Sequence, residues 1–221
     1  MQLSLTEEDY LKTIYHLSQN IDNQEISTND IAKKIDISAA SVSDMIKKLS
    51  NKKLINYIKY QGVSLTEIGK LTAVKIIRKH RLWETFLVEK LKFTWDEIHI
   101  VAEQLEHIDS DLLIQRLDEF LEFPQFDPHG DAIPNEKGEI TIIKKISLKE
   151  ANTAEALKVV AVEENSPTFL KYLSKLQIKL GTNIKIIEKN DYDNSIEIEI
   201  NQSKITMITK EVAENLYVIK I

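Results

Sequence analysis

The sequence predicts a mainly α-helical chain that ends in a small β domain. Three observations support this fold class. Apolar residues recur at helical spacing through most of residues 1–123, whereas beyond Ala154 they alternate with polar residues along five short runs. Between these regions, residues 124–138 hold three of the four prolines and two of the five glycines of the chain, which is typical of a linker or an ordered loop.

The first third of the chain carries the signals of three short helices and a hairpin. Thr6 is the predicted N-cap of a helix that runs to about residue 20. Ser27 is predicted to cap a second helix, and a brief turn at residues 36–38 leads into a third helix that begins SAASVSDM. Two extended runs then meet around Gly62 and predict a β-hairpin. This order of elements is that of a winged helix-turn-helix.

The middle of the chain predicts three more helices. The first begins at Thr66 and continues to about Leu91. Thr94 and Glu97 have the spacing of a capping box and are predicted to open the second. The third, SDLLIQRLDEFLEF, ends before Pro124 because the residue before a proline disfavours the helical conformation.

The C-terminal region alternates with a period of two. The predicted strands are LKVVAV, NIKIIEK, SIEIEI, KITMIT and YVIKI, with one helical piece, SPTFLKYLSKLQ, among them. Five short strands in about 70 residues are typical of a small SH3-like β-barrel. The predicted domains are a winged helix-turn-helix domain over residues 1–72, an α-helical domain with its linker over 73–150, and an SH3-like domain over 151–221.

Composition excludes several classes of protein. The 221 residues are 43% hydrophobic, which is enough for a sizeable core, and they contain no cysteine, so disulfides and thiolate metal sites are excluded. The N-terminal MQLSLTEEDYLKTIY is acidic and amphipathic, unlike a signal peptide. No apolar run has the length of a membrane span. We expect a cytoplasmic protein with no membrane partner.

The charge distribution indicates where double-stranded DNA would bind. The net charge is −6, yet residues 1–80 carry 12 Lys and Arg against 9 Asp and Glu, a net of +3. A polyanion therefore favours the first third of the chain. Near the start of the third helix, small and hydroxyl side chains fit a DNA groove: Ser38, Ala40, Ser41, Ser43 and Asp44. Three lysines are the expected phosphate contacts: Lys47, Lys48 and Lys59. The alternative for all of them is a solvated helix face.

A second group of residues points to a metal ion. The stretch HIVAEQLEH places four potential ligands on one side of a helix: His99, Glu103, Glu106 and His107. Three more lie on earlier helices: Asp9, His80 and Glu84. Carboxylates and imidazoles without thiolate suit Mn(II), Fe(II) or Zn(II). The alternative for any one of them is a solvated or hydrogen-bonded side chain. His16 lies outside this set, as does His129, which is predicted to be a turn residue in DPHGD.

Taken together, these motifs resemble the diphtheria-toxin-repressor family of metal-dependent transcriptional repressors. The similarity covers the first ~150 residues in one co-linear order: LTEEDYLKTIY, SVSDMIKKL, RKHRLWETFL, EIHIVAEQLEH, SDLLIQRLD and DPHGDAIP. The stretch GTNIKIIEK resembles the SH3-like third domain of the longer members. The resemblance implies a homodimer that binds a palindromic operator only when metal is bound.

The resemblance also implies two sets of metal ligands. One set is His80, Glu84 and His99, with Glu164 or its neighbour Glu163 as a third-domain ligand. The other set is Asp9, Glu103, Glu106 and His107. Iron-responsive members tend to have methionine at the position of Asp9 and cysteine at that of Glu103, so the chain looks like the manganese-responsive branch. Mn(II) is the expected cofactor, with Fe(II), or Zn(II) in vitro, as alternatives, because carboxylates are harder donors than sulfur.

One position departs from part of the family. Compact two-domain manganese regulators have a glutamate where Lys12 stands, so the resemblance does not extend to a two-manganese cluster bridged by that residue. At this position the chain resembles the longer manganese-type members instead. An ion that joins Asp9 to Glu103, Glu106 and His107 is expected to fix the orientation of the DNA-reading domain on the middle domain.

The predicted function is a metal-dependent transcriptional repressor that controls metal-ion homeostasis and is not an enzyme. Its dimer contacts are expected in the middle domain around Leu82, Phe86, Leu87 and Leu91. Two alternatives stay open. One is a carboxylate–histidine metalloenzyme, although the chain has no Glu-x-x-His of the kind that di-iron bundle enzymes use. The other is a DNA-binding protein whose metal is purely structural.

Overall fold

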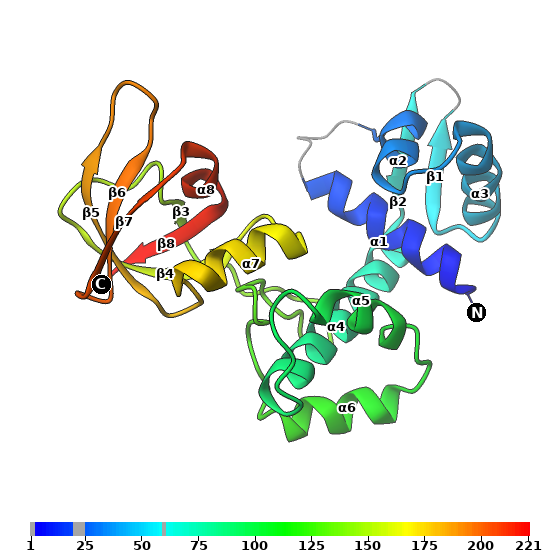
Figure 1. Ribbon diagram of the computed structural model, residues 1–221. Helices are drawn as coiled ribbons and strands as arrows, with labels where there is room; N and C mark the ends of the chain where they lie inside the picture. Colours follow the sequence, from blue (N-terminus) through cyan, green and yellow to red (C-terminus); the bar gives the residue numbers. More distant parts are fainter. Residues whose placement is uncertain (1–2, 20–24, 59–60) are drawn as a thin grey trace. The chain divides into compact units, whose positions relative to one another are not determined.

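Figure 1 shows the computed structural model, which describes residues 3–19, 25–58 and 61–221. The chain forms two compact units. The first comprises Met1–His80, Glu103–Asp111 and Pro134–Ile140. The second comprises Arg81–Ala102, Leu112–Ile133 and Thr141–Ile221. Lys59, one of the predicted phosphate contacts, lies outside the described residues.

The first unit contains the predicted winged helix-turn-helix (Figure 1). Its elements are α1 (Leu5–Gln19), α2 (Thr28–Lys34), α3 (Ala39–Asn51), β1 (Ile55–Ile58) and β2 (Gly62–Leu65). The two strands are antiparallel. On α3 the inward positions Val42, Ile46 and Leu49 are fully buried because their spacing of four and three residues keeps them on one face. They join apolar side chains of α1 and α2 in one core.

The cap of α1 differs from the prediction. The helix begins at Leu5, and Ser4 rather than Thr6 is the residue that caps it. The Glu7 amide donates to Ser4 Oγ at 3.3 Å, and the Ser4 amide donates to Glu7 Oε2 at 2.7 Å. This reciprocal pair is a capping box, and it satisfies two backbone N–H groups that the helix leaves free. A side effect is that Glu7 becomes fixed at the first turn.

The caps of α2 and α3 are as predicted. Ser27 Oγ accepts from the Asp30 amide at 3.1 Å, and Ser38 Oγ accepts from the Ser41 amide at 3.2 Å. The turn between the two helices has Asp36 at a φ of 53°, a left-handed conformation that aspartate tolerates better than most residues. These local signals set the start of each helix and the turn between the two.

The hairpin is tied to the loop before α2. The Ile26 amide donates to the Val63 carbonyl at 2.9 Å, and the Val63 amide returns the bond to Ile26 at 2.9 Å. Gly62 has a φ of +138°, and a Cβ there would lie 2.8 Å from Cβ of Glu25. A glycine is therefore required at the start of β2, both for its backbone angle and for this close approach.

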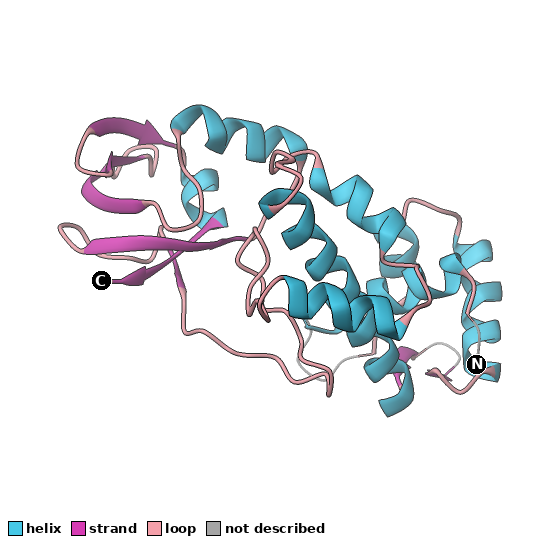
Figure 2. Cartoon of the chain, turned by 90° about the horizontal axis from the view of Figure 1, so that it is seen from below, coloured by secondary structure: helices cyan, strands magenta, loops and turns pink. Residues whose placement is uncertain are grey.

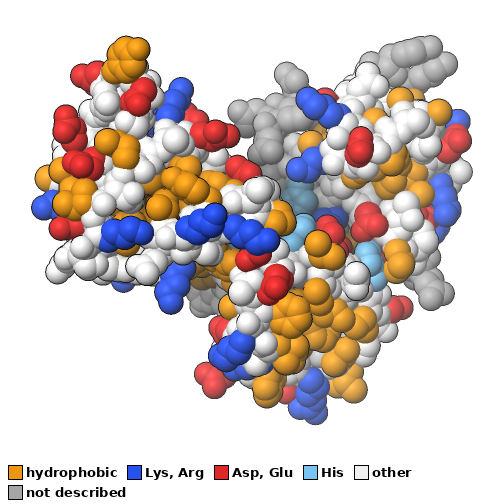
Figure 3. All heavy atoms as spheres, viewed as in Figure 1, with side chains coloured by type: hydrophobic (Ala, Val, Ile, Leu, Met, Phe, Trp, Pro, Cys, Tyr) orange, Lys and Arg blue, Asp and Glu red, His pale blue; other side chains and the backbone are white. Residues whose placement is uncertain are grey.

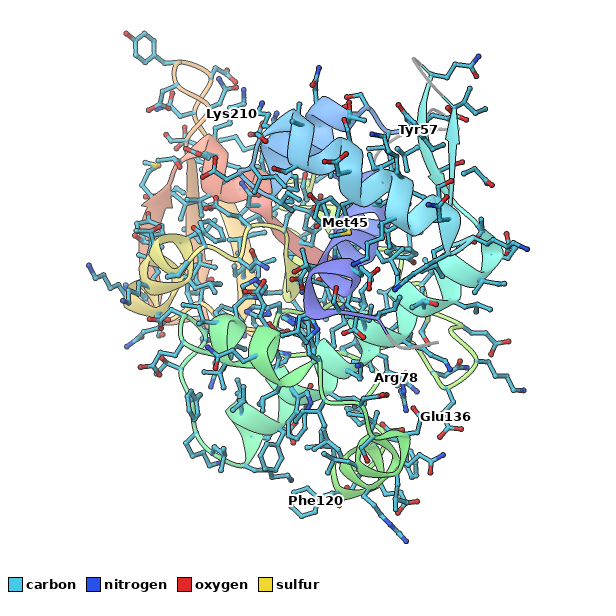
Figure 4. The ribbon with its side chains drawn as sticks, turned by 90° about the vertical axis from the view of Figure 1, so that its right-hand side faces the viewer. Met45, Tyr57, Arg78, Phe120, Glu136 and Lys210 are labelled. Atoms are coloured by element: carbon cyan, nitrogen blue, oxygen red, sulfur yellow. The ribbon has the colours of Figure 1, made fainter. Side chains whose placement is uncertain are left out.

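The middle helices are α4 (Glu67–Glu89), α5 (Ile98–Leu105) and α6 (Asp111–Phe120). α4 begins one residue later than predicted, and Thr66 caps it, since its Oγ1 accepts from the Gly69 amide at 3.0 Å. α6 ends three residues earlier than predicted because Glu122 and Phe123 adopt positive φ angles of 60° and 57°. In the first unit, Arg78 Nη1 donates to the Pro134 carbonyl at 2.6 Å, and Figure 4 shows Arg78 beside the segment that carries Glu136.

The predicted pair Thr94 and Glu97 lies just before α5 rather than at its first turn. Glu97 Oε2 accepts from the Thr94 amide at 3.1 Å and from the Thr94 hydroxyl at 2.6 Å. The Glu97 amide, however, donates to the Thr94 carbonyl at 3.1 Å, which closes a turn that precedes Ile98. The sequence signal marked the right place but the helix starts a few residues later.

The second unit contains a six-stranded antiparallel sheet in the order β3-β8-β4-β5-β6-β7. Its strands are β3 (Ile146–Ser147), β4 (Ala156–Val162), β5 (Asn183–Lys189), β6 (Ile196–Ile200), β7 (Lys204–Ile208) and β8 (Leu216–Lys220). Two helices accompany them, α7 (Pro167–Leu176) and α8 (Lys210–Asn215). Figure 2 shows these strands in magenta. The inward residues of β4, β5, β6 and β8 form the largest apolar core of the unit.

All five predicted strands and α7 are present, whereas β3 and α8 were not predicted. β3 has two residues and α8 has six, so neither is long enough to show a period in the sequence. Among the described residues, no helix has both the length and the apolar character needed to cross a bilayer.

Candidate metal centres and nucleic-acid interface

Three predicted ligands meet in the first unit. Asp9 of α1 and the two residues that follow α5, Glu106 and His107, bring ligand atoms within 4.8 Å of one another, and they are named the first cluster here. His107 Nε2 lies 3.2 Å from Asp9 Oδ1 and 3.9 Å from Glu106 Oε1. The Glu106 side chain is fully buried, whereas that of Asp9 is 48% exposed. The cluster therefore has a fixed inner carboxylate and an outer one that solvent reaches.

Two cationic or proton-bearing partners hold the Glu106 carboxylate. Lys12 Nζ donates to Oε1 at 2.6 Å, and His80 Nδ1 lies 2.5 Å from Oε2. Burial opposes ionisation of Glu106, but the contacts with His80 and Lys12 outweigh it and lower the pKa of this carboxyl. Asp9 shows the opposite balance, because burial and the charges of Glu106 and Glu103 raise its pKa despite His107 and Lys12. An added positive charge would stabilise both carboxylates in their ionised form.

Glu8 contacts the first cluster, although the sequence interpretation did not single it out. Its Oε2 lies 2.7 Å from His107 Nδ1, on the side of the imidazole ring opposite Asp9. A carboxylate in that place orients a ligating histidine and leaves Nε2 for the ion. No local pattern could reveal this role, since the contact joins residues 99 positions apart.

Glu103 is placed less closely than predicted. Its side chain is 49% exposed, its Oε1 lies 3.9 Å from Lys12 Nζ, and it is not part of the group whose ligand atoms lie within 4.8 Å of one another. Glu103 and Glu106 thus share Lys12, but only Glu106 makes the short contact. Membership of Glu103 in the metal site stays a prediction.

A second cluster lies in the second unit and includes His129, which also lies in the predicted turn. Glu84 of α4 and two residues of the DPHGD loop, Asp127 and His129, bring ligand atoms within 4.8 Å of one another, and all three are at most 4% exposed. His129 Nδ1 lies 3.5 Å from Glu84 Oε2. His129 Nε2 is buried and has no hydrogen-bond partner. The three side chains therefore have the residue types and the closeness that a metal site requires, and His129 supplies one of them from within the predicted turn.

The DPHGD loop is held rigidly. Asp127 Oδ1 accepts from the amides of His129 and Asp131 at 2.8 and 3.0 Å. The ring of Trp95 stacks on that of His129 with centroids 5.9 Å apart. Gly130 has a φ of +86°, and a Cβ there would lie 1.8 Å from the Val160 carbonyl oxygen, so the loop packs directly on β4. The positions of the cluster's side chains therefore follow from the packing of the loop against the sheet.

Negative charge exceeds positive charge in the second cluster. Burial, and then the charges of Glu84 and Asp131, raise the pKa of Asp127 to about 7, although Arg81 Nε lies 3.6 Å from its Oδ2. Burial lowers the pKa of His129, but the contact with Glu84 and the neighbouring carboxylates outweigh it, so the pKa is raised. Such a group needs protons or a cation, and its oxygen and nitrogen donors suit a divalent ion.

The predicted ligands Glu84 and His99 also lie together in the second unit. His99 Nδ1 lies 3.5 Å from Glu84 Oε1, as the predicted set requires. His80 stands one turn before Glu84 on α4, and its Nδ1 contacts Glu106 of the first cluster. Glu164 accepts a 2.5 Å hydrogen bond from Ser166 Oγ at the N-cap of α7. In the part of the chain that the structure describes, neither Glu164 nor Glu163 joins a group of three ligand-type side chains.

The predicted DNA-binding side chains lie on α3 and its N-cap. Six of them are exposed: Ser38, Ala40, Ser41, Asp44, Lys47 and Lys48. Ser43 is half-buried and donates to the Ala39 carbonyl at 2.9 Å. Lys47 Nζ lies 3.2 Å from Asp44 Oδ1 in an exposed pair. Lys48 differs, because its Nζ lies 3.4 Å from a buried carboxylate oxygen of Glu7. Figure 4 shows α3 from its outer side, with Met45 between it and α1.

Three family models match the chain along nearly its whole length. Residues 2–63 match the N-terminal DNA-binding domain of iron-dependent repressors. Residues 66–135 match the metal-binding and dimerisation domain of the same proteins. Residues 146–220 match the FeoA domain.

Individual proteins agree with these matches. The iron-dependent repressor IdeR of Mycobacterium tuberculosis is 33% identical over 129 residues, which are 58% of this chain and 55% of IdeR. The chain thus spans about half the length of such curated relatives, and less of some others.

Two solved structures resemble the whole chain. A manganese-dependent transcriptional repressor in complex with manganese has a TM-score of 0.86 and 32% identity, covering 97% of this chain and 99% of that one. ScaR with bound Zn²⁺ has a TM-score of 0.76 and 34% identity, covering 97% and 99%. With a DNA-binding domain, a metal-binding domain and an SH3-like FeoA domain in this order, the chain belongs to the diphtheria-toxin-repressor family of metal-dependent transcriptional repressors.

Proposed function

We propose that the chain binds a palindromic operator in double-stranded DNA as a homodimer when Asp9, Glu106 and His107 hold Mn(II), and that it thereby controls metal-ion homeostasis in the cytoplasm without catalysing a reaction. The observation that carries this proposal is the first cluster, in which a buried carboxylate, an outer carboxylate and an oriented imidazole converge from α1 and the end of α5. A bound divalent ion would supply the positive charge that these donors lack.

The chain's own residues explain how α1 can influence DNA binding. Asp9 lies on α1, and the inward side chains of the same helix, Tyr10 and Leu11, are buried in one core with Val42 and Ile46 of α3. Because a close-packed core transmits displacement, the position of α1 biases the position of α3. Asp9, Glu106 and His107 favour one arrangement by binding the ion more tightly in it, and that difference in affinity is the regulatory free energy.

The donor set favours Mn(II) over softer ions. The first cluster and Glu103 offer carboxylate oxygens and one imidazole, and the chain has no cysteine that could supply a thiolate. Among relatives, one repressor is described in complex with manganese, ScaR with Zn²⁺, and IdeR as iron-dependent. We therefore propose Mn(II) as the physiological ion, Fe(II) as the alternative and Zn(II) as an in vitro substitute.

The second cluster extends the proposal to another metal position. We propose that Glu84 ligates there with Asp127 and His129, with the predicted ligand His99 beside Glu84. Support comes from the ligand atoms of these three residues, which lie within 4.8 Å of one another, and from the excess of buried negative charge. The third-domain ligand, Glu164 or Glu163, stays a sequence prediction.

A titration of DNA binding with each metal tests the proposal. The probe is a duplex of about 30 base pairs selected from a random pool in the presence of Mn(II), which spans two half-sites. Metal-free protein should remain folded by circular dichroism yet bind the duplex weakly, and Mn(II) should restore tight binding. Equal DNA binding with and without metal would leave the metal purely structural, as in the alternative reading of the sequence.

Lys47→Ala should weaken binding to all duplexes by a similar factor. An exposed lysine on α3 contributes by neutralising a phosphate, so the slope of log affinity against log salt should fall by about one. Lys185→Ala, at an exposed lysine of β5, is the matched control and should leave the slope unchanged. Anisotropy at several salt concentrations measures both, and an unchanged slope for Lys47→Ala would remove α3 from the DNA interface.

His129→Gln should remove one metal ion per chain. The amide cannot replace the imidazole nitrogen next to Glu84 and Asp127, whereas the first cluster stays intact. Equilibrium dialysis against Mn(II) or Zn(II), with metal analysis by mass spectrometry, gives the stoichiometry. Wild-type stoichiometry in the variant would show that the second cluster is held by hydrogen bonds and protons alone.

The dimer surface is proposed at α6. Figure 3 shows hydrophobic side chains gathered over this helix. The exposed members are Leu91, Leu112, Leu113, Phe120 and Phe123. Of the predicted contacts, Leu82 and Leu87 are buried inside the protomer, at 0% and 2% exposure, so they cannot serve directly. Helical periodicity indicates that a side chain is buried, but it does not show whether the side chain is buried inside the protomer or between two protomers. Phe86 packs beside Phe120, with ring centroids 6.1 Å apart.

A further inference from the structure

Glu7 is a buried carboxylate that neither metal cluster uses. It lies in the first turn of α1 and is 1% exposed. Its Oε1 lies 2.7 Å from Lys52 Nζ and 3.4 Å from Lys48 Nζ, while Oε2 accepts from the Ser4 amide at 2.7 Å. Lys48 is in the last turn of α3 and Lys52 is its C-cap residue. Glu7 therefore joins the start of α1 to the end of the DNA-binding helix.

The next two residues of the same helical turn face the first cluster. Glu8 contacts His107 Nδ1 at 2.7 Å, and Asp9 contacts His107 Nε2 at 3.2 Å. Successive residues of an α-helix point about 100° apart, so Glu7 and Asp9 project to nearly opposite sides. One rigid turn thus carries contacts to His107 on one side and to α3 on the other.

The buried Glu7 carboxylate is surrounded by polar partners. Two lysine ammonium groups and one backbone amide lie within 3.4 Å of the Glu7 carboxyl oxygens. The buried carboxylate depends on these partners, since removal of one partner of a buried ion pair leaves an uncompensated charge. Two lysines at the C-terminal end of α3 also interact favourably with the helix dipole.

We propose that Glu7 is a positioning residue that transmits occupation of the first cluster to α3 through its ion pairs with Lys52 and Lys48. The inference rests on the proposed function. When Asp9 and His107 are drawn together, the turn that holds Asp9 moves as a unit, and Glu7 moves the end of α3 with it. Lys48 then pairs with Glu7 of α1 instead of contacting a phosphate, which revises its predicted role as a DNA contact.

Glu7→Gln tests this role, because the amide keeps the shape and the bond to Ser4 but loses the charge. The measured quantity is the ratio of DNA affinities with and without Mn(II), using the selected duplex and the full chain. In wild type the ratio should lie in the range of allosteric coupling, roughly 5–150-fold. In Glu7→Gln it should fall at least about threefold, while Mn(II) affinity in the absence of DNA stays within about twofold of wild type.

Three further measurements make the outcome decisive. Lys52→Gln, at the helix end, should reduce the ratio as Glu7→Gln does, whereas Lys34→Gln, at an exposed lysine in the last turn of α2, should not. Hydrogen exchange should show that Mn(II) protects α3 in wild type but less so in Glu7→Gln. Thermal melting confirms that each variant is folded.

The results separate this inference from the proposed function. A wild-type ratio of one would overturn the proposed function and the role of Glu7 with it. A wild-type ratio well above one that is unchanged in Glu7→Gln would overturn the role of Glu7 alone. A loss of Mn(II) affinity in Glu7→Gln in the absence of DNA would also overturn the role of Glu7, because the effect would then lie at the first cluster.

Discussion

Glu106→Gln is expected to raise the Mn(II) concentration needed for DNA binding by at least about 100-fold. Changing a partner that only orients a ligand typically costs 10–100-fold in metal affinity, and Glu106 is itself an inner carboxylate of the first cluster. The amide has nearly the same volume and can still accept from Lys12, so the loss should fall on the metal rather than on the fold. Isothermal titration with Mn(II) and metal-dependent anisotropy with the selected duplex measure the two effects.

Glu103 provides the matched comparison. Glu103 and Glu106 both contact Lys12, but Glu103 is half exposed and lies farther from the ammonium group, at 3.9 Å against 2.6 Å. Glu103→Gln should therefore cost less Mn(II) affinity than Glu106→Gln. If Glu103 nevertheless ligates the bound ion, Glu103→Cys should shift activation from Mn(II) towards Zn(II) or Fe(II), because a thiolate is the softer donor. Unchanged Mn(II) dependence in Glu106→Gln would contradict the first cluster as the activating site.

The fold was largely predictable because its signals are local. Ser27 and Ser38 cap α2 and α3 through the hydroxyl bonds that their residue type favours, and the period of two marked all five long strands of the SH3-like domain. The errors also have local causes. Ser4 displaced Thr6 as a cap because Glu7 completed the capping box with it. The predicted family and fold class are confirmed by the three matched domains.

The sites were harder to predict because their geometry is not local. Asp9, Glu106 and His107 could be proposed from spacing and resemblance, yet Glu8 has no signal other than a contact with a residue far along the chain. His129 looked like a turn residue because its neighbours are proline and glycine. The turn is real, but the packing of Gly130 on β4 aims the imidazole at Glu84 instead of solvent. Tertiary packing, rather than sequence pattern, decided that position.

The second large effect is expected at the apolar surface of α6. Leu112 and Phe120 are 64% and 60% exposed, and a monomer gains nothing by presenting such side chains to water. A two-fold symmetric dimer buries each of them twice, and each buried side chain contributes about 1.5–3 kcal/mol. Leu112→Asp with Phe120→Asp should therefore raise the dimer dissociation constant by well over about 100-fold. Sedimentation equilibrium measures the constant directly.

Loss of the dimer should also abolish high-affinity DNA binding, because one winged helix reaches only one half-site of a palindrome. Tyr192→Asp is the control for an exposed aromatic residue, since Tyr192 is 95% exposed at the end of the hairpin between β5 and β6 and lies outside the proposed interface. It should leave both the dimer and DNA binding intact. Were the α6 double variant to sediment as a dimer with unchanged operator affinity, the dimer would have to form through another surface, and the apolar face of α6 would need a different partner.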